Sequence, residues 1–346
     1  MPQNIVTGVE EILYSGQLAY GKWGRKLEEE LIKYLGNANV LATNSHSAAL
    51  HVAFSTLGVV AGDEVIMSPM CCLQSTQPLV ARGAKIVWAD IDPATGTLDP
   101  DSVKSKITQK TKAIFHNQHM GFVGYIEEIN AIAKNAGIYT IDDCVDGMGG
   151  IYKGKKVGNV GSDATVISFH AVRLPNAIEG GAVSFNNSGH FQNAKIIRDQ
   201  GIDRSQFRDT RGEISEDYDV ITAGYPALPN DLSSYLAFKQ MKDLDKLFEI
   251  QHNNVKKWKQ FIETENIPAR QIDIVPESQP NNWVFGMLTD KKNEMIDYFR
   301  AIGYYASGVH LNNNRYSLFG DKTKLKGVDE FYSRFVALPS GWWCTL

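Results

Sequence analysis

The chain has 346 residues, of which 43% are hydrophobic and 21% are charged, and its formal net charge is −4. This balance predicts a soluble protein with apolar material for a large and a small domain, and it argues against a nucleic-acid surface because no long basic run occurs. No apolar stretch approaches the ~20 residues that span a bilayer, so no membrane partner is expected. The N-terminus does not resemble a signal peptide, and the four cysteines show neither a CxxC pair nor a zinc spacing. A cytoplasmic location is therefore predicted.

The chain begins with two predicted amphipathic helices. The first lies in "MPQNIVTGVEEIL", where apolar and acidic residues alternate. The second is "RKLEEELIKYLG", in which Leu27, Leu31 and Leu35 share one face and Gly36 follows the last turn. A glycine directly after the apolar stripe is typical of a helix C-terminus.

From residue 39 to residue 186, short apolar runs alternate with helix-like segments. Strands are predicted in "NVLAT", "EVIMS", "KIVWADID", "KAIFH", "IYTIDD", "TVISF" and "GAVSF". Helices are predicted between them, for example in "SAALHVAFSTLG", "STQPLVARG" and "IEEINAIAKNAG". This alternation indicates right-handed crossovers and a mostly parallel sheet, which binds ligands at the carboxyl ends of its strands.

A long helical stretch is predicted next, from about Asp231 to Glu263. Its apolar stripe, which we interpret as core, consists of Met241, Leu244, Phe248, Val255, Trp258 and Ile262. After it the pattern changes to a strand in "NNWVFGML", a helix in "DKKNEMIDYFRAIG" and strands in "YYASGVH" and "FVALP". We therefore predict a large domain over residues 1–264 and a small α/β domain over residues 265–346.

Two strand ends carry polar residues. In "TNSHSAAL", Ser45 and Ser47 stand where a helix begins, which suits either ordinary capping or a phosphate, because a helix N-terminus offers free N–H groups. In "IDDCVDG", a predicted strand ends in Asp142 and Asp143, and Asp146 lies just beyond it. These acids are interpreted as acid–base groups, partners of a cationic ring nitrogen, or simply solvated acids. No histidine or cysteine lies at metal-ligand spacing, so no metal site is predicted.

A third strand end, in "SFHAVRLPNAIEGGAV", adds Ser168, His170 and Arg173. A phosphate cradle, a carboxylate and a basic residue after a later strand together suggest pyridoxal phosphate, whose protonated ring acts as an electron sink. The usual fourth part of such a site is a lysine that holds the aldehyde as a Schiff base. No lysine lies between Lys156 and Lys195.

Nearly the whole chain, from about Glu11 to Thr345, resembles the DegT/DnrJ/EryC1/StrS family of sugar aminotransferases. The resemblance is carried by "SGQLAYG", "SAALHVAFSTLGVVAGDEVIMSP", "GAKIVWADIDPATGTLDPDSV", the stretch from "TKAIFHNQHMGFVGYIEE" to "TVISFHAV", "EGGAV" and "ALPSGWW". It implies an α/β fold, namely a three-layer fold-type-I aminotransferase with a mostly parallel central sheet and a small C-terminal α/β domain. It also implies a homodimer that uses pyridoxal or pyridoxamine 5′-phosphate to move an amino group from glutamate to a nucleotide-linked keto-sugar, in amino-sugar or polysaccharide biosynthesis.

The resemblance also implies roles for individual residues. The cofactor-binding residues would be Ser45, His46, Ser47 and Ser168 at the phosphate, Asp143 at the ring nitrogen, Asp146 near the ring hydroxyl, Leu73 at the ring face and Asn230 from the partner's loop. The catalytic residues would be Asp143, His170 and Arg173, the last at the Schiff-base lysine position. The sugar nucleotide would meet Tyr20, Gly21, His310, Asn312 and Arg315. Leu73 departs from the family pattern because an aromatic residue is usual there.

Arg173 leaves the function open, because a guanidinium group is never a free amine at neutral pH and forms no Schiff base. The first explanation is an engineered substitution that traps an adduct on an aminotransferase. The second is an enzyme that uses pyridoxamine phosphate to dehydrate a keto-sugar, assisted by His170 or Arg173. The third is a homologue without transamination that binds a nucleotide sugar. An ordinary dinucleotide oxidoreductase is not supported, since no GxGxxG follows the first strand.

Overall fold

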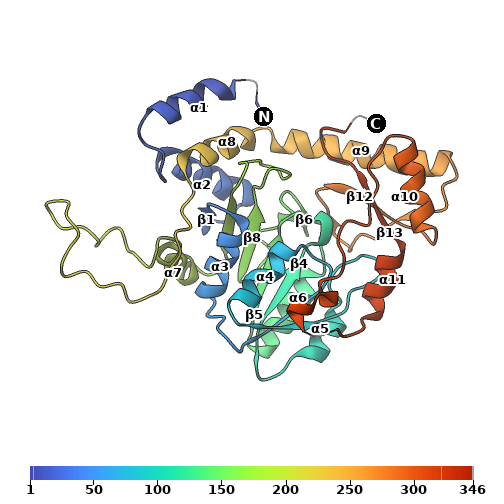
Figure 1. Ribbon diagram of the computed structural model, residues 1–346, viewed down its shortest axis with the longest axis horizontal. Coiled ribbons are helices and arrows are strands. Elements are labelled where there is room, and N and C mark those ends of the chain that lie inside the picture. The colour runs from blue at the N-terminus through green and yellow to red at the C-terminus, as the bar shows by residue number, and fades with distance from the viewer. Residues whose placement is uncertain (3, 321, 345–346) are drawn as a thin grey trace.

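The computed structural model describes residues 1–2, 4–320 and 322–344, and in this part of the chain a seven-stranded sheet forms the centre of the molecule (Figure 1). The strand order is β1-β9-β8-β5-β4-β2-β3, and β9 alone runs against the others. The bounds are β1 Val40–Thr43, β2 Glu64–Met67, β3 Lys85–Trp88, β4 Thr111–Asn117, β5 Tyr139–Cys144, β8 Ala164–Ser168 and β9 Gly181–Phe185. The predicted mostly parallel sheet is confirmed.

Helices cover both faces of this sheet, which gives the predicted three layers. On one face lie α3 (His46–Thr56), α4 (Leu73–Ala81) and α7 (Ser188–Arg198), whose apolar side chains share a core with Phe115 of β4. The other face is covered by α5 (Pro100–Lys106) and α6 (Ile126–Ala136), which pack against Ile114 of the same strand. Neighbouring residues of a strand thus enter different cores, because side chains alternate between the two faces.

The N-terminal helices α1 (Ile5–Tyr14) and α2 (Lys22–Leu35) are confirmed, and the stripe on α2 is buried against β1. The single long helix predicted from Asp231 is wrong, because the structure breaks it into α8 (Asp231–Met241) and α9 (Leu244–Thr264). Tyr235 and Leu236 of α8 pack against α1, whereas α9 extends to the second sheet. Separate packing partners explain the break, and the predicted apolar stripe is buried on both helices.

A smaller sheet, in the order β10-β12-β13, follows α9. Its strands are β10 Arg270–Gln271, β12 Val284–Leu288 and β13 Phe335–Pro339, and it carries α10 (Lys292–Ala301) and α11 (Lys326–Arg334). The strand predicted in "YYASGVH" is wrong, since within the described residues that segment makes a single bridge, Ser307 to Ala337. The proposed domain boundary falls at the end of α9, although the largest core joins residues from both sides of it.

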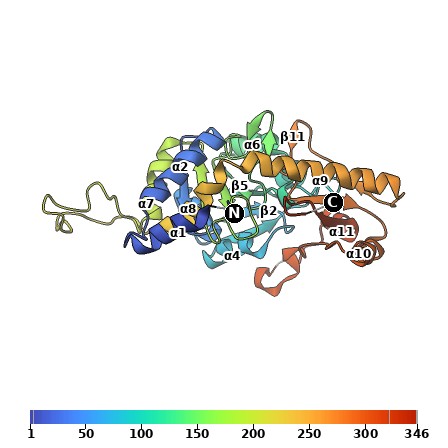
Figure 2. The same cartoon turned by 90° about the horizontal axis from the view of Figure 1, so that it is seen from above.

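Three short strands, β6 (Ile151–Tyr152), β7 (Lys155–Lys156) and β11 (Ser278–Gln279), form a third sheet that joins residues before and after α9. Short 3₁₀ turns occur at η1 (His119–Gly121), η2 (Asn313–Arg315) and η3 (Ser317–Phe319). The middle of the segment between α7 and α8, residues 199–230, projects from the body as an arm (Figures 1 and 2), whereas its ends are packed, with Ala227 buried in the main core. In the described residues no helix is both long and apolar enough to cross a membrane.

Candidate active site

Asp142 and Asp143 are consecutive residues near the carboxyl end of β5, and their side chains lie on opposite faces of the sheet. Asp143 lies on the face covered by α3 and α4, where it contacts residues of both helices, and Asp142 lies on the face covered by α5 and α6. Asn117, at the carboxyl end of β4, is the register partner of Asp143. The parallel register therefore places the polar strand ends side by side, as expected for the ligand edge of such a sheet.

The carboxylate of Asp143 is fully buried and accepts four hydrogen bonds from described residues. Its Oδ1 atom accepts from Nε2 of His46 at 2.9 Å and from the backbone N–H of Val145 at 3.2 Å. Its Oδ2 atom accepts from Oγ of Ser75 at 2.5 Å and from Nδ2 of Asn117 at 2.7 Å. Because an ionised carboxylate offers about four acceptor positions, the four donors fill it.

These donors keep Asp143 ionised. Burial by itself would raise the pKa of this carboxyl, but the interaction with His46 and the hydrogen bonds from Ser75 and Asn117 outweigh burial and lower the pKa below its ordinary value. The site therefore contains a permanent negative charge at neutral pH, of the kind that stabilises a protonated ring nitrogen.

The turn before α3 lies against this carboxylate. Ser45 is the N-cap of α3, and its Oγ atom accepts the backbone N–H of Ala48 at 3.0 Å, while Ser47 Oγ accepts Nε2 of Gln74 at 3.3 Å. Gly181 of β9 makes room for the turn, since a Cβ atom there would lie 2.9 Å from the carbonyl oxygen of Ser45. The first turn of α3 thus combines hydroxyl groups with free backbone N–H groups, which suits a phosphate.

Arg173 is held between an acid and an aromatic ring. Its Nη2 atom lies 2.5 Å from Oδ1 of Asp146, and its guanidinium carbon lies 4.2 Å from the ring centre of Trp283. Burial raises the pKa of Asp146, and Arg173 offsets this only in part. The Nε and Nη1 atoms of Arg173 are buried and find no hydrogen-bond acceptor among the described residues, so three N–H groups are unpaired there.

Three further residues were predicted near the cofactor: Ser168, Leu73 and Asn230. Ser168 is buried at the end of β8, where its Oγ atom accepts the backbone N–H of His170 at 3.3 Å. Leu73 begins α4 with 36% of its surface exposed. Asn230 is an exposed N-cap of α8 and accepts the backbone N–H of Ser233 at 2.7 Å, so within this chain it is a helix cap.

Two of the predicted sugar-binding residues take part in a separate network. The hydroxyl group of Tyr20 donates to Glu28 Oε2 at 2.6 Å, and the backbone N–H of Gly21 donates to Oδ1 of Asp231 at 2.9 Å. Burial and Glu28 together raise the pKa of Tyr20. Within the described chain, neither residue forms a hydrogen bond or ion pair with Asp143, so their predicted role in sugar binding stays a prediction.

The other three predicted sugar-binding residues, His310, Asn312 and Arg315, lie in a loop that Asn313 attaches to the segment before α4. Asn313 is buried and donates to the carbonyl oxygen of Cys71 at 3.1 Å, in the segment just before α4. His310 is half-buried, and its pKa is lowered by burial and by the charge of Arg173. Asn312 donates to Oδ1 of Asn314 at 2.6 Å, and Arg315 is exposed.

Three residues of this site were missed in the sequence: Ser75, Asn117 and Trp283. Asn117 could have been found, because it is a polar residue directly after the predicted strand "KAIFH". Ser75 and Trp283 carry no comparable signal. One lies in the first turn of a helix and the other 110 residues beyond Arg173, and only the fold brings them to the carboxylate and the guanidinium group.

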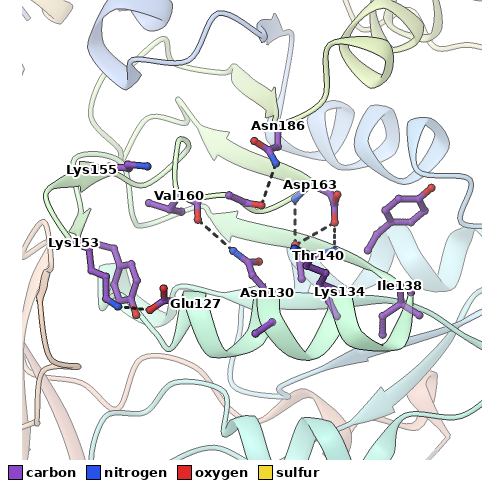
Figure 3. Close-up of a pocket in the computed structure, with 16 residues that line it drawn as sticks. Glu127, Asn130, Lys134, Ile138, Thr140, Lys153, Lys155, Val160, Asp163 and Asn186 are labelled. Carbon is purple, nitrogen blue, oxygen red and sulfur yellow. Dashed lines mark hydrogen bonds and ion pairs between the residues drawn. The ribbon is translucent and has the colours of Figure 1, made fainter.

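A different hollow, with a volume of about 720 Å³, lies at the amino end of β5. Figure 3 shows its lining, in which Lys153 is paired with Glu127 and Asn130 donates to the carbonyl oxygen of Val160. Tyr139, the first residue of β5, also lines it, whereas Asp143 lies near the other end of that strand. This hollow is therefore separate from the edge that carries the buried acids.

Comparison with known proteins decides the family. The profile of the DegT/DnrJ/EryC1/StrS aminotransferase family matches residues 1–342. The chain belongs to this family. It is 32% identical to the uncharacterized protein MJ1066 of Methanocaldococcus jannaschii over 237 residues, which are 68% of this chain and 61% of that protein.

Two further relatives match along nearly the whole chain. The spore coat polysaccharide biosynthesis protein SpsC of Bacillus subtilis is 26% identical over 96% of this chain and 88% of its own length. The crystal structure of the sugar aminotransferase CalS13 from Micromonospora echinospora is 26% identical and superposes with a TM-score of 0.91, covering 100% of this chain and 94% of that one. The predicted fold-type-I aminotransferase fold is confirmed.

Aminotransferases of this family depend on pyridoxal 5′-phosphate, which alternates with pyridoxamine 5′-phosphate during turnover. The donor set fits the phosphate of this cofactor, which the turn from Ser45 to Ser47 suits, and the ionised Asp143 supplies the charge that a protonated ring nitrogen needs, although donors of this chain already fill its acceptor positions. The resemblance puts Arg173 where the family has its Schiff-base lysine, and a guanidinium group offers no free amine for such a bond. Whether this chain holds the cofactor through noncovalent contacts alone therefore stays a prediction.

Proposed function

We propose that the protein acts on a keto-sugar linked to a nucleoside diphosphate, with glutamate as amino donor, in cytoplasmic amino-sugar or polysaccharide biosynthesis. The observation that carries this proposal is the meeting of an ionised Asp143, the turn at Ser45–Ser47 and Arg173 at one edge of the sheet. The names of SpsC and CalS13, which refer to polysaccharide biosynthesis and to a sugar aminotransferase, support the choice of a sugar.

When bound, the cofactor supplies the amino group and an electron-withdrawing ring. The residues of this chain supply binding and charge. Asp143 keeps a negative charge at the ring, and the first turn of α3 holds the phosphate through N–H and hydroxyl groups. The three unpaired N–H groups on Nε and Nη1 of Arg173 would hold a carboxylate or phosphate of a substrate.

Proton transfer is the step that this chain performs poorly. In the reaction of this family, a lysine at the position of Arg173 moves a proton between two carbons, and a guanidinium group keeps its proton at neutral pH. His170, three residues earlier and half-buried, is the nearest titratable group in the sequence to take over that task. We therefore expect slow turnover.

The first test compares the chain with its Arg173→Lys variant. Each protein is mixed with pyridoxal 5′-phosphate and a panel of UDP-, dTDP- and GDP-linked amino sugars, and the visible absorbance of the cofactor is followed in time. We expect the variant to convert its preferred sugar at least 100-fold faster, because a positioned general base typically contributes 10²- to 10⁴-fold. Equal rates for the two proteins, or fast turnover by the arginine form, would contradict the proposal.

A second candidate function is a nucleotide-sugar-binding homologue without catalysis. It is favoured by the contacts of Arg173, whose charge is already paired with Asp146 and covered by Trp283. The same panel distinguishes the two functions, since a binding protein would retain nucleotide-sugar affinity and gain no activity from Arg173→Lys. If neither the chain nor its Arg173→Lys variant bound any nucleotide sugar of the panel, both functions would be contradicted.

We also propose that the protein works as a homodimer. The arm within residues 199–230 projects from the body and exposes apolar side chains, with Ile214 at 59% and Ile221 at 87% exposure. Such side chains on a projecting segment suit burial against a second copy of the chain. Sedimentation equilibrium measures the mass, and a monomer at micromolar concentration would contradict this part of the proposal.

A further inference from the structure

The imidazole of His46 and the predicted phosphate site belong to the same turn. His46 is the first residue of α3, directly after the N-cap Ser45, and it is fully buried. Its backbone faces the place where a phosphate would lie, while its side chain reaches Asp143. A cofactor that spans from this turn to Asp143 would therefore meet the His46 side chain on the way.

We propose that His46 occupies the hydrogen-bonding position on Asp143 that the ring nitrogen of the cofactor needs, so that cofactor binding in this chain is weak and insensitive to that nitrogen. The inference rests on the proposed function, because it concerns the same site. An imidazole and a protonated pyridine are both planar aromatic rings that donate one N–H to a carboxylate. With four donors already present, the pyridine N–H would be a fifth.

His46 is a side-chain donor that can be displaced, as is Ser75, but only the His46 ring resembles the pyridine ring in shape. Val145 donates through its backbone, and Asn117 is fixed by its place in β4 beside Asp143. The imidazole, in contrast, makes one hydrogen bond, since its Nδ1 atom is buried without a partner in the described part of the chain. Removing the imidazole would thus free one position on Asp143 and leave no other group unpaired.

The second acid at this edge, Asp146, also has a basic partner within this chain. Asp146 is buried and forms its ion pair with Arg173. Each acid predicted to meet the cofactor therefore already has a basic partner in this chain: His46 for Asp143, and Arg173 for Asp146. We therefore expect the site to be stable without a bound cofactor, because each of the two buried carboxylates contacts a basic side chain of the chain itself.

The test measures binding rather than turnover. Isothermal titration calorimetry gives the dissociation constants of pyridoxamine 5′-phosphate and of its 1-deaza analogue, in which C–H replaces the ring nitrogen. We expect the natural chain to bind both compounds within about threefold. His46→Ala is expected to prefer pyridoxamine 5′-phosphate by tenfold or more, because the freed carboxylate gains a charge-assisted hydrogen bond to the ring nitrogen alone.

His116→Ala is the matched control. It removes an equally buried imidazole that is bound to the neighbouring carboxylate, with Nδ1 of His116 lying 3.1 Å from Oδ1 of Asp142. We expect this variant to show no preference for the ring nitrogen. A preference of similar size in both variants would overturn the inference, because it would reflect general loosening of the core. Circular dichroism checks that each variant is folded.

Two further results would overturn the inference. A tenfold preference of the natural chain for pyridoxamine 5′-phosphate would show that His46 does not compete, and it would leave the proposed function intact. This measurement also decides the matter if His46→Ala does not fold. Failure of both the natural chain and folded His46→Ala to bind either compound would overturn the inference together with the cofactor part of the proposed function.

Discussion

Asp142 and Asp143 are neighbours in β5 with the same kinds of partners and different surroundings. Each is buried and bound by a histidine, a serine hydroxyl and a side-chain amide. Asp142 receives these donors on the face covered by α5 and α6, where Ser162 and His116 surround it. Asp143 receives them from α3, α4 and β4, next to a helix N-terminus that suits a phosphate. Local chemistry therefore does not distinguish the two acids, whereas the face of the sheet on which each lies does.

The largest expected effect comes from removing either carboxylate. Asp142→Ala and Asp143→Ala each leave a buried histidine without its carboxylate acceptor, so each is expected to lower the free energy of unfolding by about 4 kcal/mol. Urea titration followed by circular dichroism measures this loss. Since the two acids have matching partners, losses that differ by more than twofold would break the comparison.

A third buried histidine shows what an acid partner contributes. His119 forms no ion pair with an acid in the described part of the chain and packs against the rings of Phe331 and Phe335. Burial, with a smaller contribution from His310, lowers the pKa of His119 to about 3. The unfolded chain binds this proton below about pH 6.5 and the folded chain does not, so stability is complete above pH 6.5 and is lost as the pH falls toward 3.

His119→Leu is therefore expected to flatten the pH dependence of stability. Between pH 7 and pH 5, the natural chain should lose on the order of 2 kcal/mol more unfolding free energy than the variant. Urea titrations of both proteins at the two pH values give this difference directly. Parallel losses in the two proteins would show that His119 takes up a proton in the folded state at pH 5.

The smallest expected effect comes from the serine hydroxyls. Ser75→Ala and Ser162→Ala each remove one hydrogen bond to a buried carboxylate, at 2.5 Å and 2.7 Å, and each should lower the unfolding free energy by roughly 1.5 kcal/mol. Thermal or urea unfolding measures both. An unchanged free energy of unfolding in Ser75→Ala would show that Asp143 does not need all four of its donors. It would also weaken the argument that the acceptor positions of Asp143 are full.

Much of the fold could be predicted because its signals are local. The seven apolar runs between residues 39 and 186 are the seven strands of the main sheet, and the polar strand ends identified Asp143 and Ser45. The break between α8 and α9 could not be predicted, since the apolar stripe runs through it and only the separate packing partners of the two helices decide where the chain bends. The strand predicted in "YYASGVH" was wrong for a similar reason. Strand pairing depends on a neighbouring strand that is distant in the sequence, and this segment makes only one bridge, from Ser307 to Ala337, among the described residues.

The sequence by itself determined the order of the elements, the edge of the main sheet where polar strand ends gather and the arginine at residue 173, because periodicity and residue identity are properties of the chain. Only the tertiary structure decided that His46 points to Asp143 and that Arg173 lies between Asp146 and Trp283. These contacts join residues 27 to 110 positions apart in the chain. Their geometry follows from how helices and strands pack, and no local pattern encodes it.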